Sequence, residues 1–347
     1  MGIKGLSALI KRFAPEGQKT VPLGTLARGW YAVDVSGYLY ASQYNAEHKG
    51  KNNHIRDFFN LISKGAEHGL RFVFVFDGNT HSAAKQGTIE DRAEKTQGQK
   101  DRIKTLLNLD PGSDERQTSS SDLKALGLAR LKEDLPAEDR IELGLLLRNF
   151  IVITPQCYAD LKLLFQYVGA PFLRAQGEAD FVCAALSRAG LVQGVISEDM
   201  DMLSHGVGLL VRGLMNARSN DVTLYTLAAV LAGMELTLAQ FHELSVLCGC
   251  DYAAKLDGVA GVRGLTLLKK FKTIAGILAE GKIKASAEFP EAAARAVGIF
   301  SANQEELPAG FTLPSGYLID PAVKAWLGTS TGPVANLDGK LKIMAAA

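Results

Sequence analysis

The segment Arg71–Gly78, RFVFVFDG, decides the fold of this chain. Its apolar run is nearly continuous, which is typical of a strand covered on both faces, as in a parallel sheet. The run ends in Asp77, followed by a glycine that favours a turn. We therefore predict a mostly parallel sheet around this segment. Three other apolar runs should form further strands of this sheet: Trp30–Val35, Leu191–Ser197 and Gly208–Arg212.

Helical spacing of apolar residues marks the segments between these strands, at Ile55–Ala66, Tyr158–Val168 and Ala179–Ala189. Alternating strands and helices predict an α/β fold with a mostly parallel central sheet sandwiched by helices. The alternation of strands and helices is interrupted at residues 85–149, which are polar and helical. A Pro-, Gly- and Ser-rich loop at Asp110–Ser121 divides this stretch. We interpret the stretch as a helical insertion, a feature that often forms a lid.

The chain becomes helical again after Leu224, and the apolar stretch Leu224–Phe241 is interpreted as a buried helix. The remaining tail has no motif. These observations divide the chain into five parts: residues 1–84 and 150–223 as two halves of the α/β core, 85–149 as the insertion, 224–281 as a helical region and 282–347 as a C-terminal extension.

Composition excludes several classes of protein. The 38 basic and 37 acidic side chains leave a net charge of +1, which excludes a polycation that coats nucleic acid but allows a local basic patch. None of the four cysteines forms a C-x-x-C pair, which argues against zinc and for a reducing compartment. Without a signal peptide or membrane span, we expect an intracellular protein: nuclear in a eukaryote or nuclear-replicating virus, otherwise cytoplasmic.

Seven acidic residues lie at the predicted ends of strands or beside helix termini. Each alone has an ordinary explanation, such as a turn, a solvated loop or a charge that favours the start of a helix. Their joint placement indicates a site, because the carboxyl ends of parallel strands form the ligand crevice of such folds. The seven residues are Asp34, Asp77, Glu178, Asp180, Asp199, Asp201 and Asp251.

Converging carboxylates need cations. At 4 Å and an effective dielectric constant of about 20, each like-charge pair costs roughly 4 kcal/mol, so such a group either protonates or binds metal ions. Oxygen ligands without clustered His or Cys select Mg²⁺ or Mn²⁺. Two such ions serve in-line displacement at phosphorus. The pattern therefore predicts hydrolysis of a phosphodiester with two Mg²⁺ ions, for which Mn²⁺ can substitute.

Two groups of basic residues suit this substrate. Lys85 and Arg92 are seven residues apart and share one face of the first insertion helix, although such a pair is more often simply solvated. In Lys255–Lys272, KLDGVAGVRGLTLLKKFK, a glycine-containing turn between two helices offers backbone N–H groups to a phosphate. Lys269 and Lys270 extend that contact. An ordinary helical hairpin is the alternative.

The order of these motifs is similar to that of a known family. MGIKGL, the strand that ends in Asp34, VFVFDG, GEAD, SEDMD, GCDY and DGVAGVRG follow one another as in the flap endonuclease superfamily, the Rad2-like structure-specific 5′ nucleases. The resemblance spans about residues 1–271, with a weakly matching middle. It implies that residues 85–149 form a helical arch or cap and that the C-terminal helical region contains a helix-two-turn-helix.

The resemblance also implies individual roles. The seven carboxylates would hold two metal ions or support their ligands, and the backbone of Gly2 would approach the active site. Tyr40 would stack on a base next to the scissile phosphate, which Lys85 and Arg92 would steer while a free 5′ strand threads the arch. The helix-two-turn-helix would grip the downstream duplex, usually with a bound K⁺, through Gly258, Gly261 and Arg263.

Some residues depart from the family pattern. Asp180 stands where flap endonucleases more often have Glu, which favours the exonuclease branch. Ala260 and Val262 replace a glycine and a basic residue of the turn, which weakens the expectation of a K⁺ site. The C-terminus has neither a clamp-binding motif nor a basic tail, so we expect no recruitment by a sliding clamp.

We predict a metal-dependent 5′ nuclease, either a flap endonuclease or a 5′-3′ exonuclease. It would act as a monomer in replication or repair, on branched or nicked double-stranded DNA with a 5′ single strand. One alternative is an RNA-directed nuclease of the same fold, which a preference for 2′-OH groups would reveal. A catalytically silent junction-binding protein is disfavoured by the seven acids, which repel phosphates. A small-molecule phosphatase is disfavoured by the insertion and the basic turn.

Overall fold

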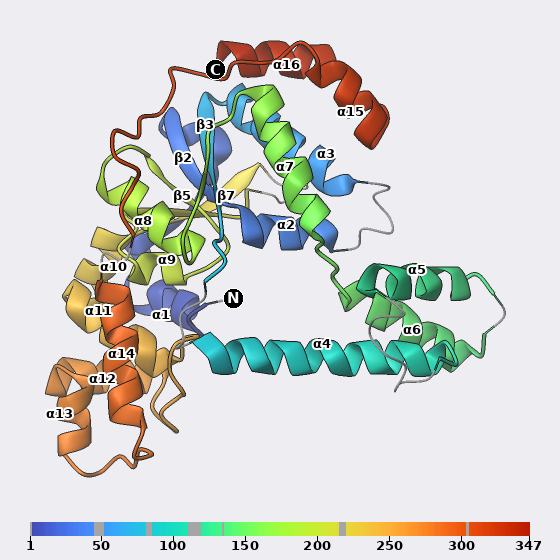
Figure 1. Ribbon diagram of the computed structural model, residues 1–347. Coiled ribbons are helices and arrows are strands. Elements are labelled where there is room, and N and C mark those ends of the chain that lie inside the picture. The colour runs from blue at the N-terminus through green and yellow to red at the C-terminus, as the bar shows by residue number, and fades with distance from the viewer. Residues whose placement is uncertain are drawn as a thin grey trace.

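The structure is a computed structural model that describes residues 2–44, 52–80, 85–109, 119–133, 135–214, 220–302 and 305–347. These residues form a seven-stranded sheet with strand order β1-β7-β6-β5-β2-β3-β4, and helices surround it (Figure 1). The predicted α/β fold with a mostly parallel sheet is confirmed.

The sheet has a parallel part and an antiparallel edge. β2 pairs in parallel with β3 and β5, and the pairs β3–β4 and β5–β6 are also parallel, whereas β7 runs antiparallel to both β1 and β6. The strands are β1 (Gln18–Pro22), β2 (Gly29–Asp34), β3 (Leu70–Phe76), β4 (Phe172–Arg174), β5 (Gly194–Ile196), β6 (Leu209–Arg212) and β7 (Asp221–Thr226).

The four predicted strands correspond to β2, β3, β5 and β6, although β5 is shorter than predicted. The sequence does not predict β1, β4 or β7. β4 has only three residues. β1 has no buried residue and β7 has only two, so neither strand at the antiparallel edge has a continuous apolar run.

Helices α3 (Asn53–Glu67) and α7 (Pro155–Val168) pack beside each other near β3. The ring of Phe165 stacks on that of Phe74 with 3.9 Å between centroids, and Phe58 lies 6.0 Å from both. Helix α8 (Ala179–Arg188) packs on β2, β3 and β5. All three helices match the predicted ones. Between and around these elements lie α2 (Val35–Gln43), α9 (Asp201–Ser204), α1 (Leu6–Phe13) and two 3₁₀ turns, η1 (Pro15–Gly17) and η2 (Leu23–Thr25).

The insertion has a small core of its own. Figure 1 shows α4 (Gln86–Leu106) running away from the sheet to α5 (Ser120–Arg130) and α6 (Ala137–Asn149). Most of the predicted loop, residues 110–118, lies outside the described residues. The three helices bury a cluster that is separate from the main core, formed by Ile103, Leu123, Leu135, Leu143, Leu147 and Phe150.

The helical region begins at Leu227, because β7 extends to Thr226. The interpretation of Leu224–Phe241 as one helix is therefore wrong: Glu235, with φ 55°, ends one helix in a left-handed conformation, and Thr237 caps the next. Because apolar residues lie on both sides of Glu235, the sequence pattern does not show this break. The helices of the region are α10 (Leu227–Met234), α11 (Leu238–Cys248), α12 (Gly261–Phe271) and α13 (Ile274–Ala279).

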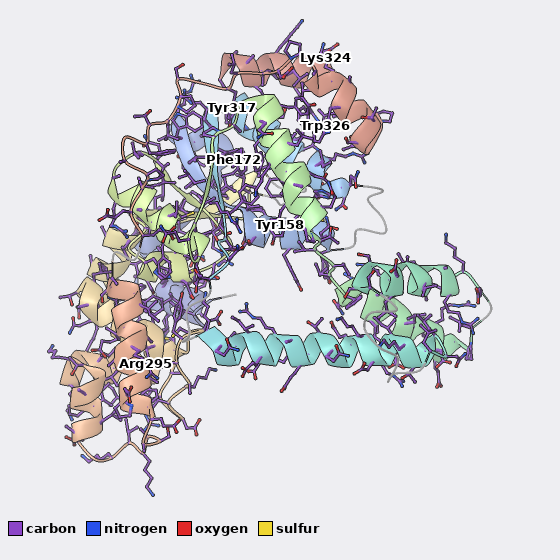
Figure 2. All side chains as sticks on the ribbon, viewed as in Figure 1. Tyr158, Phe172, Arg295, Tyr317, Lys324 and Trp326 are labelled. Atoms are coloured by element: carbon purple, nitrogen blue, oxygen red, sulfur yellow. The ribbon has the colours of Figure 1, made fainter. Side chains whose placement is uncertain are left out.

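The C-terminal extension crosses from one end of the molecule to the other (Figure 1). Its α14 (Phe289–Ser301) packs on α11 and α13, whereas α15 (Val323–Thr331) and α16 (Leu337–Ala346) pack on α3. The backbone N–H of Phe72 donates to the hydroxyl of Tyr317 over 2.6 Å, and Trp326 lies 5.2 Å from Tyr167 (Figure 2).

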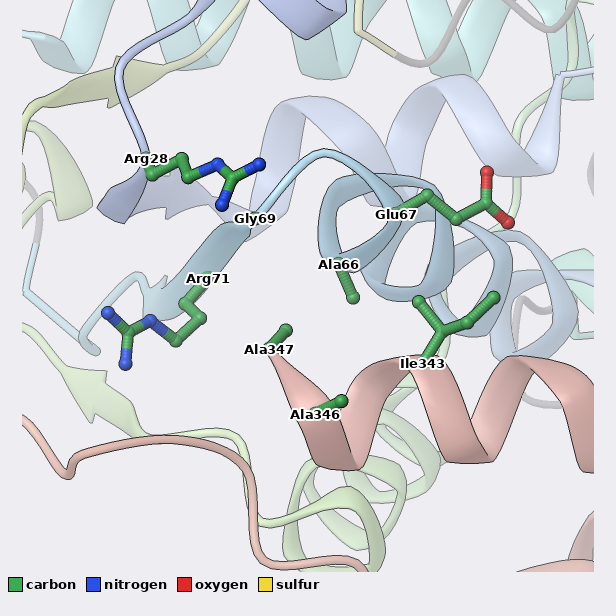
Figure 3. A pocket seen from close by; sticks show the side chains of 8 residues that line it. All are labelled: Arg28, Ala66, Glu67, Gly69, Arg71, Ile343, Ala346 and Ala347. Carbon is green, nitrogen blue, oxygen red and sulfur yellow. The ribbon is translucent and has the colours of Figure 1, made fainter.

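A pocket of about 370 Å³ lies beneath the end of α16. Ile343, Ala346 and Ala347 line one side, and Arg28 and Arg71 lie across from them (Figure 3). Because Arg28 precedes β2 and Arg71 lies near the start of β3, the pocket lies at the opposite end of these strands from Asp34 and Asp77. It is therefore separate from the acidic edge of the sheet.

No helix in the described ranges is both long enough and apolar enough to cross a bilayer.

Candidate active site

The first two acids are brought together by the ends of adjacent strands. Asp34 is the last residue of β2, and Asp77 directly follows β3. Ser36, in the first turn of α2, connects them: its backbone N–H donates to Asp34 Oδ1 over 3.0 Å, and its hydroxyl donates to Asp77 Oδ2. Asp34 therefore caps α2 while its carboxylate stays at the strand end.

Hydrogen bonds continue from Asp34 into the EDMD segment after β5. The hydroxyl of Ser197 donates to Asp34 Oδ2 over 3.0 Å and accepts from the Asp199 N–H over 3.1 Å. The Asp201 N–H then donates to Asp199 Oδ1 over 2.9 Å. This short turn explains how two aspartates with one residue between them both reach the edge of the sheet.

The start of α8 faces the same edge. Glu178 is the N-cap residue of α8, and Asp180 lies in its first turn. Asp77 Oδ1 accepts the backbone N–H of Ala179 over 2.8 Å, so a carboxylate from β3 satisfies a free donor of this helix. The helix dipole favours negative charge at this end.

Two cations from α4 approach the cluster. The ammonium of Lys85, the N-cap residue of α4, donates to Glu178 Oε2, and only 16% of the Lys85 side chain is exposed. Arg92 donates to Asp251 Oδ2 over 2.8 Å from a half-exposed position. The structure therefore brings Lys85 and Arg92 to the acids, one pair buried and the other near the surface.

Burial and neighbouring charge disfavour ionisation of Asp34. Burial is the main cause that raises the pKa of Asp34, to about 7, and the charges of Asp77 and Asp199 add to it. Hydrogen bonds from Ser197 and Ser36 oppose the shift. A carboxylic acid with this pKa is half-protonated near neutral pH unless a cation offsets the repulsion.

The same repulsion extends to the other acids. Burial, followed by the charge of Asp199, raises the pKa of both Asp180 and Asp201 well above the ordinary value. The ammonium of Lys85 lowers both pKa values, but not enough to cancel the increase. Burial works against the charge of Lys85, yet these carboxylates and Glu178 outweigh it and raise the Lys85 pKa.

The donor set fits a hard divalent cation. It contains only carboxylate oxygens, and two of them, Glu178 Oε1 and Asp201 Oδ1, are buried without a hydrogen-bond partner among the described residues. No three His, Cys, Asp or Glu side chains in that part of the chain surround one point closely enough to hold an ion as they stand. Lys85 supplies positive charge among them instead.

Gly2 explains part of this geometry. Its φ is +88°, and a Cβ at Gly2 would overlap Asp199 Oδ1 and lie 2.6 Å from Asp201 Oδ1. The chain therefore passes so close to the two aspartates that only glycine fits without moving them.

Gly2→Ala should reduce turnover about tenfold or more, because the new methyl group must displace the two carboxylates and small misplacements are costly. Gly5→Ala is the matched control: Gly5 also has a positive φ, +72°, but nothing lies within 4 Å of its Cβ position. Both variants should lose some stability in thermal unfolding. Equal single-turnover rates for the two variants would argue against a role for Gly2.

Asp34→Asn should stabilise the metal-free protein at pH 8 but not near pH 5. The folded-state pKa of Asp34, about 7, exceeds the ordinary value of about 4, so the native state holds the proton more tightly. Stability contributed by protonated Asp34 is therefore lost as pH rises from about 4 through 7. An amide has the shape of the protonated carboxylic acid, with one accepting oxygen and one donating group, but never ionises. Melting in EDTA across this pH range measures the difference, and equal melting temperatures at pH 8 would contradict the prediction.

The other predicted DNA-binding residues lie outside the carboxylate cluster. Tyr40 on α2 is 47% exposed, so its ring is open to solvent. Gly258 and Gly261 both have positive φ, and Arg263 donates to the Gly258 carbonyl over 2.8 Å. The turn before α12 therefore has a defined conformation that a hydrogen bond stabilises. Lys269 pairs with Glu235 over 2.7 Å, and Lys270 lies over the ring of Phe271.

Sequence reasoning gave no role to three residues of the site. Ser36 and Ser197 connect the carboxylates, and Tyr252 donates its hydroxyl to Glu178 Oε2 over 2.8 Å. The signal for Tyr252 is its place directly after Asp251 in GCDY. The serines follow strand ends in the same way as the aspartates.

Comparison with known proteins identifies the family. The family model of the XPG N-terminal domain matches residues 1–99, and that of the XPG I-region matches residues 169–251, which together cover just over half of the chain. The chain is 30% identical over 289 residues to flap endonuclease 1 of Caenorhabditis briggsae, an alignment that covers 80% of this chain and 68% of that protein. The chain belongs to the XPG/Rad2 flap endonuclease superfamily.

The solved structures of this superfamily agree in fold. The catalytic core of Rad2 in complex with a DNA substrate superposes with a TM-score of 0.68 at 20% identity, over 98% of each chain. Flap endonuclease-1 from Methanococcus jannaschii gives 0.61 at 17% identity, over 97% of each chain. This XPG/Rad2 protein is a structure-specific nuclease that acts on DNA phosphodiester bonds, and its family uses divalent metal ions. The two family models leave residues 100–168 and 252–347 uncovered, and the first of these segments contains most of the insertion.

Proposed function

We propose that this nuclease is a 5′ nuclease that cuts DNA at or near the junction between a 5′ single strand and a duplex, leaving 5′-phosphate and 3′-hydroxyl ends. The observation that supports this proposal is the gathering of the seven carboxylates at one edge of the sheet, next to the two basic residues at the base of α4. An acidic site alone would repel DNA, whereas these cations offer contacts to the scissile phosphate.

The carboxylates would hold two divalent ions, with Mg²⁺ as the natural choice for an all-oxygen site. When bound, such ions supply the Lewis-acid chemistry for in-line displacement at phosphorus. Asp34, Asp77, Glu178 and Asp180 would form or support one group of ligands, and Asp199, Asp201 and Asp251 the other. Asp199 lies at the centre of the electrostatic cluster, since its charge raises the pKa of Asp34, Asp180 and Asp201.

The chain's own cations would position the substrate. Lys85 and Arg92 now pair with Glu178 and Asp251, so both must leave their carboxylates to contact a phosphate. The exposed ring of Tyr40 would stack on the base beside that phosphate, which fixes its orientation without reading sequence.

The duplex would lie against the turn before α12. The turn lies at the start of α12, where the N-terminal end of a helix favours a phosphate, and Arg263, Lys269 and Lys270 add positive charge. K⁺ at this turn remains a weaker expectation because of Ala260 and Val262. The catalytic core of Rad2, which has this fold, is solved in complex with a DNA substrate, which supports DNA binding here.

The experiment is a cleavage assay on end-labelled 5′-flap, nicked and single-stranded DNA, with Mg²⁺ and with EDTA, alongside a flap whose single strand is RNA. One Mg²⁺-dependent cut near the flap junction is the expected result. Stepwise release of mononucleotides would assign the protein to the exonuclease branch, and preference for the RNA flap would assign an RNA substrate. Binding without any cleavage would overturn the proposal.

A further inference from the structure

The C-terminal extension reaches the active site through one aromatic residue, Phe300 in α14. The Phe300 side chain is 3% exposed and lies among three other rings. Its centroid is 5.3 Å from that of Tyr252 in an edge-to-face contact at 84°, 5.2 Å from His205 and 6.2 Å from His242. Such contacts restrict the orientation of each ring in the group.

The rings around Phe300 are apolar packing surfaces. Burial, together with the nearby charge of Lys85, lowers the pKa of His205 to about 3, so this ring is neutral throughout the physiological range. Burial likewise lowers the pKa of His242. The Nε2 atoms of both histidines are buried without a hydrogen-bond partner in the part of the chain described. Both imidazoles therefore pack against Phe300, and His242 also has a hydrogen bond with the backbone of Ser204.

Tyr252 connects this packing to the proposed catalytic groups. Its hydroxyl donates to Glu178 Oε2 over 2.8 Å, and the Lys85 ammonium lies over its ring, 4.8 Å from the centroid. In this hydrogen bond the phenol is the donor, because the carboxylate oxygen accepts. One tyrosine thus orients both a carboxylate and the cation paired with it.

We infer that Phe300 is a positioning residue of the active site, which holds Tyr252 in the orientation that sets Glu178 and Lys85. Glu178 Oε1 has no hydrogen-bond partner among the described residues, so the two bonds at Oε2, from Tyr252 and from Lys85, fix how this carboxylate presents its second oxygen. Without the Phe300 ring, Tyr252 gains room to tilt, and Glu178 loses its fixed direction. A segment without any sequence motif thereby contributes to catalysis at a distance.

The helix itself offers a matched control. Phe289 is also 3% exposed and lies in α14, but at its other end and without a ring contact to the site. Replacing either phenylalanine with leucine removes similar buried volume from the same helix, so the two variants should melt at similar temperatures. Any difference in their catalytic behaviour then reports on position rather than on stability.

The test is a double-mutant cycle with Phe300→Leu and Tyr252→Phe, measured by single-turnover cleavage of a 5′ flap and by calorimetric titration of the DNA-free protein with Mg²⁺. Tyr252→Phe should slow cleavage by about tenfold to a hundredfold, the usual worth of a hydrogen bond to a charged group. Phe300→Leu should slow it by about tenfold, with DNA affinity unchanged, and weaken Mg²⁺ binding. The double variant should be no worse than Tyr252→Phe, because Phe300 acts through that hydroxyl.

The cleavage rate of Phe289→Leu should stay within about twofold of the wild-type rate. When Phe289→Leu is combined with Tyr252→Phe, the two fold losses in rate should multiply, because the residues act independently. Equal rates for Phe300→Leu and Phe289→Leu, or losses that multiply in the double variant, would overturn the inference. The inference rests on the proposed function, but the two can be distinguished. If the wild-type protein does not cleave DNA, the Mg²⁺ titrations still test whether Phe300 acts through Tyr252. Equal Mg²⁺ affinity in all variants would refute the inference.

Discussion

Asp199→Asn is expected to abolish cleavage of a 5′ flap while leaving DNA binding intact. The change removes one negative charge but keeps an oxygen that can accept the Asp201 N–H, so the turn after β5 should survive. It removes the charge that acts on three neighbouring carboxylates, Asp34, Asp180 and Asp201. The proposed metal site then loses the carboxylate at its centre, and loss of a catalytic group costs roughly 10³-fold or more.

Single-turnover rates in Mg²⁺ and anisotropy of labelled flap DNA in EDTA measure the two effects separately. Asp338→Asn is the control, because Asp338 lies on α16 in an exposed pair with Lys324, far from the acidic edge. This control should cleave at the wild-type rate. Retained turnover in Asp199→Asn would remove the EDMD segment from the mechanism, and lost binding would show that the charge serves folding instead.

The sequence predicts the parallel centre of the fold because its strands are buried on both faces. β3 is apolar at nearly every position, since α3 and α8 pack against it and Phe165 of α7 stacks on its Phe74. β1 and β7 pair at the antiparallel edge, where polar residues are tolerated, so their pattern is no different from that of a loop. The break at Glu235 depends on a left-handed backbone that an apolar pattern does not reveal.

The acids of the site are predictable for a related reason. Asp34 ends β2, and Asp77 directly follows β3. Because β2 and β3 pair in parallel with Asp34 opposite Val75, the two aspartates must lie close together. The contacts that orient the acids are not predictable in this way. Tyr252 reaches Glu178 and Phe300 across large separations in sequence, and tertiary packing, which includes that of α11 against α14, brings them together.

Lys85→Met should lower the single-turnover rate by about 10²- to 10³-fold, the usual loss when one preorganised donor to a reacting oxyanion is removed. Methionine keeps much of the length and packing of lysine, so the base of α4 should remain in place. DNA affinity should change little, because one phosphate contact among many carries a small share of binding. Lys85→Arg is the matched variant, since it keeps the charge but changes the shape of the donor.

The same substitution has a second expected effect, on stability without metal. The carboxylates raise the pKa of Lys85, so its charge stabilises the folded state at every pH below the ordinary lysine value and is lost only above it. Lys85→Met should therefore melt at a lower temperature than the wild-type protein in EDTA across pH 6 to 9, because the buried carboxyl of Glu178 loses its cation. Mg²⁺ should restore part of that loss by binding the folded state. A normal cleavage rate with a lowered melting temperature would mean that Lys85 only balances the charge of the buried carboxylates. An unchanged melting temperature with a slow cleavage rate would mean that Lys85 acts on the phosphate alone.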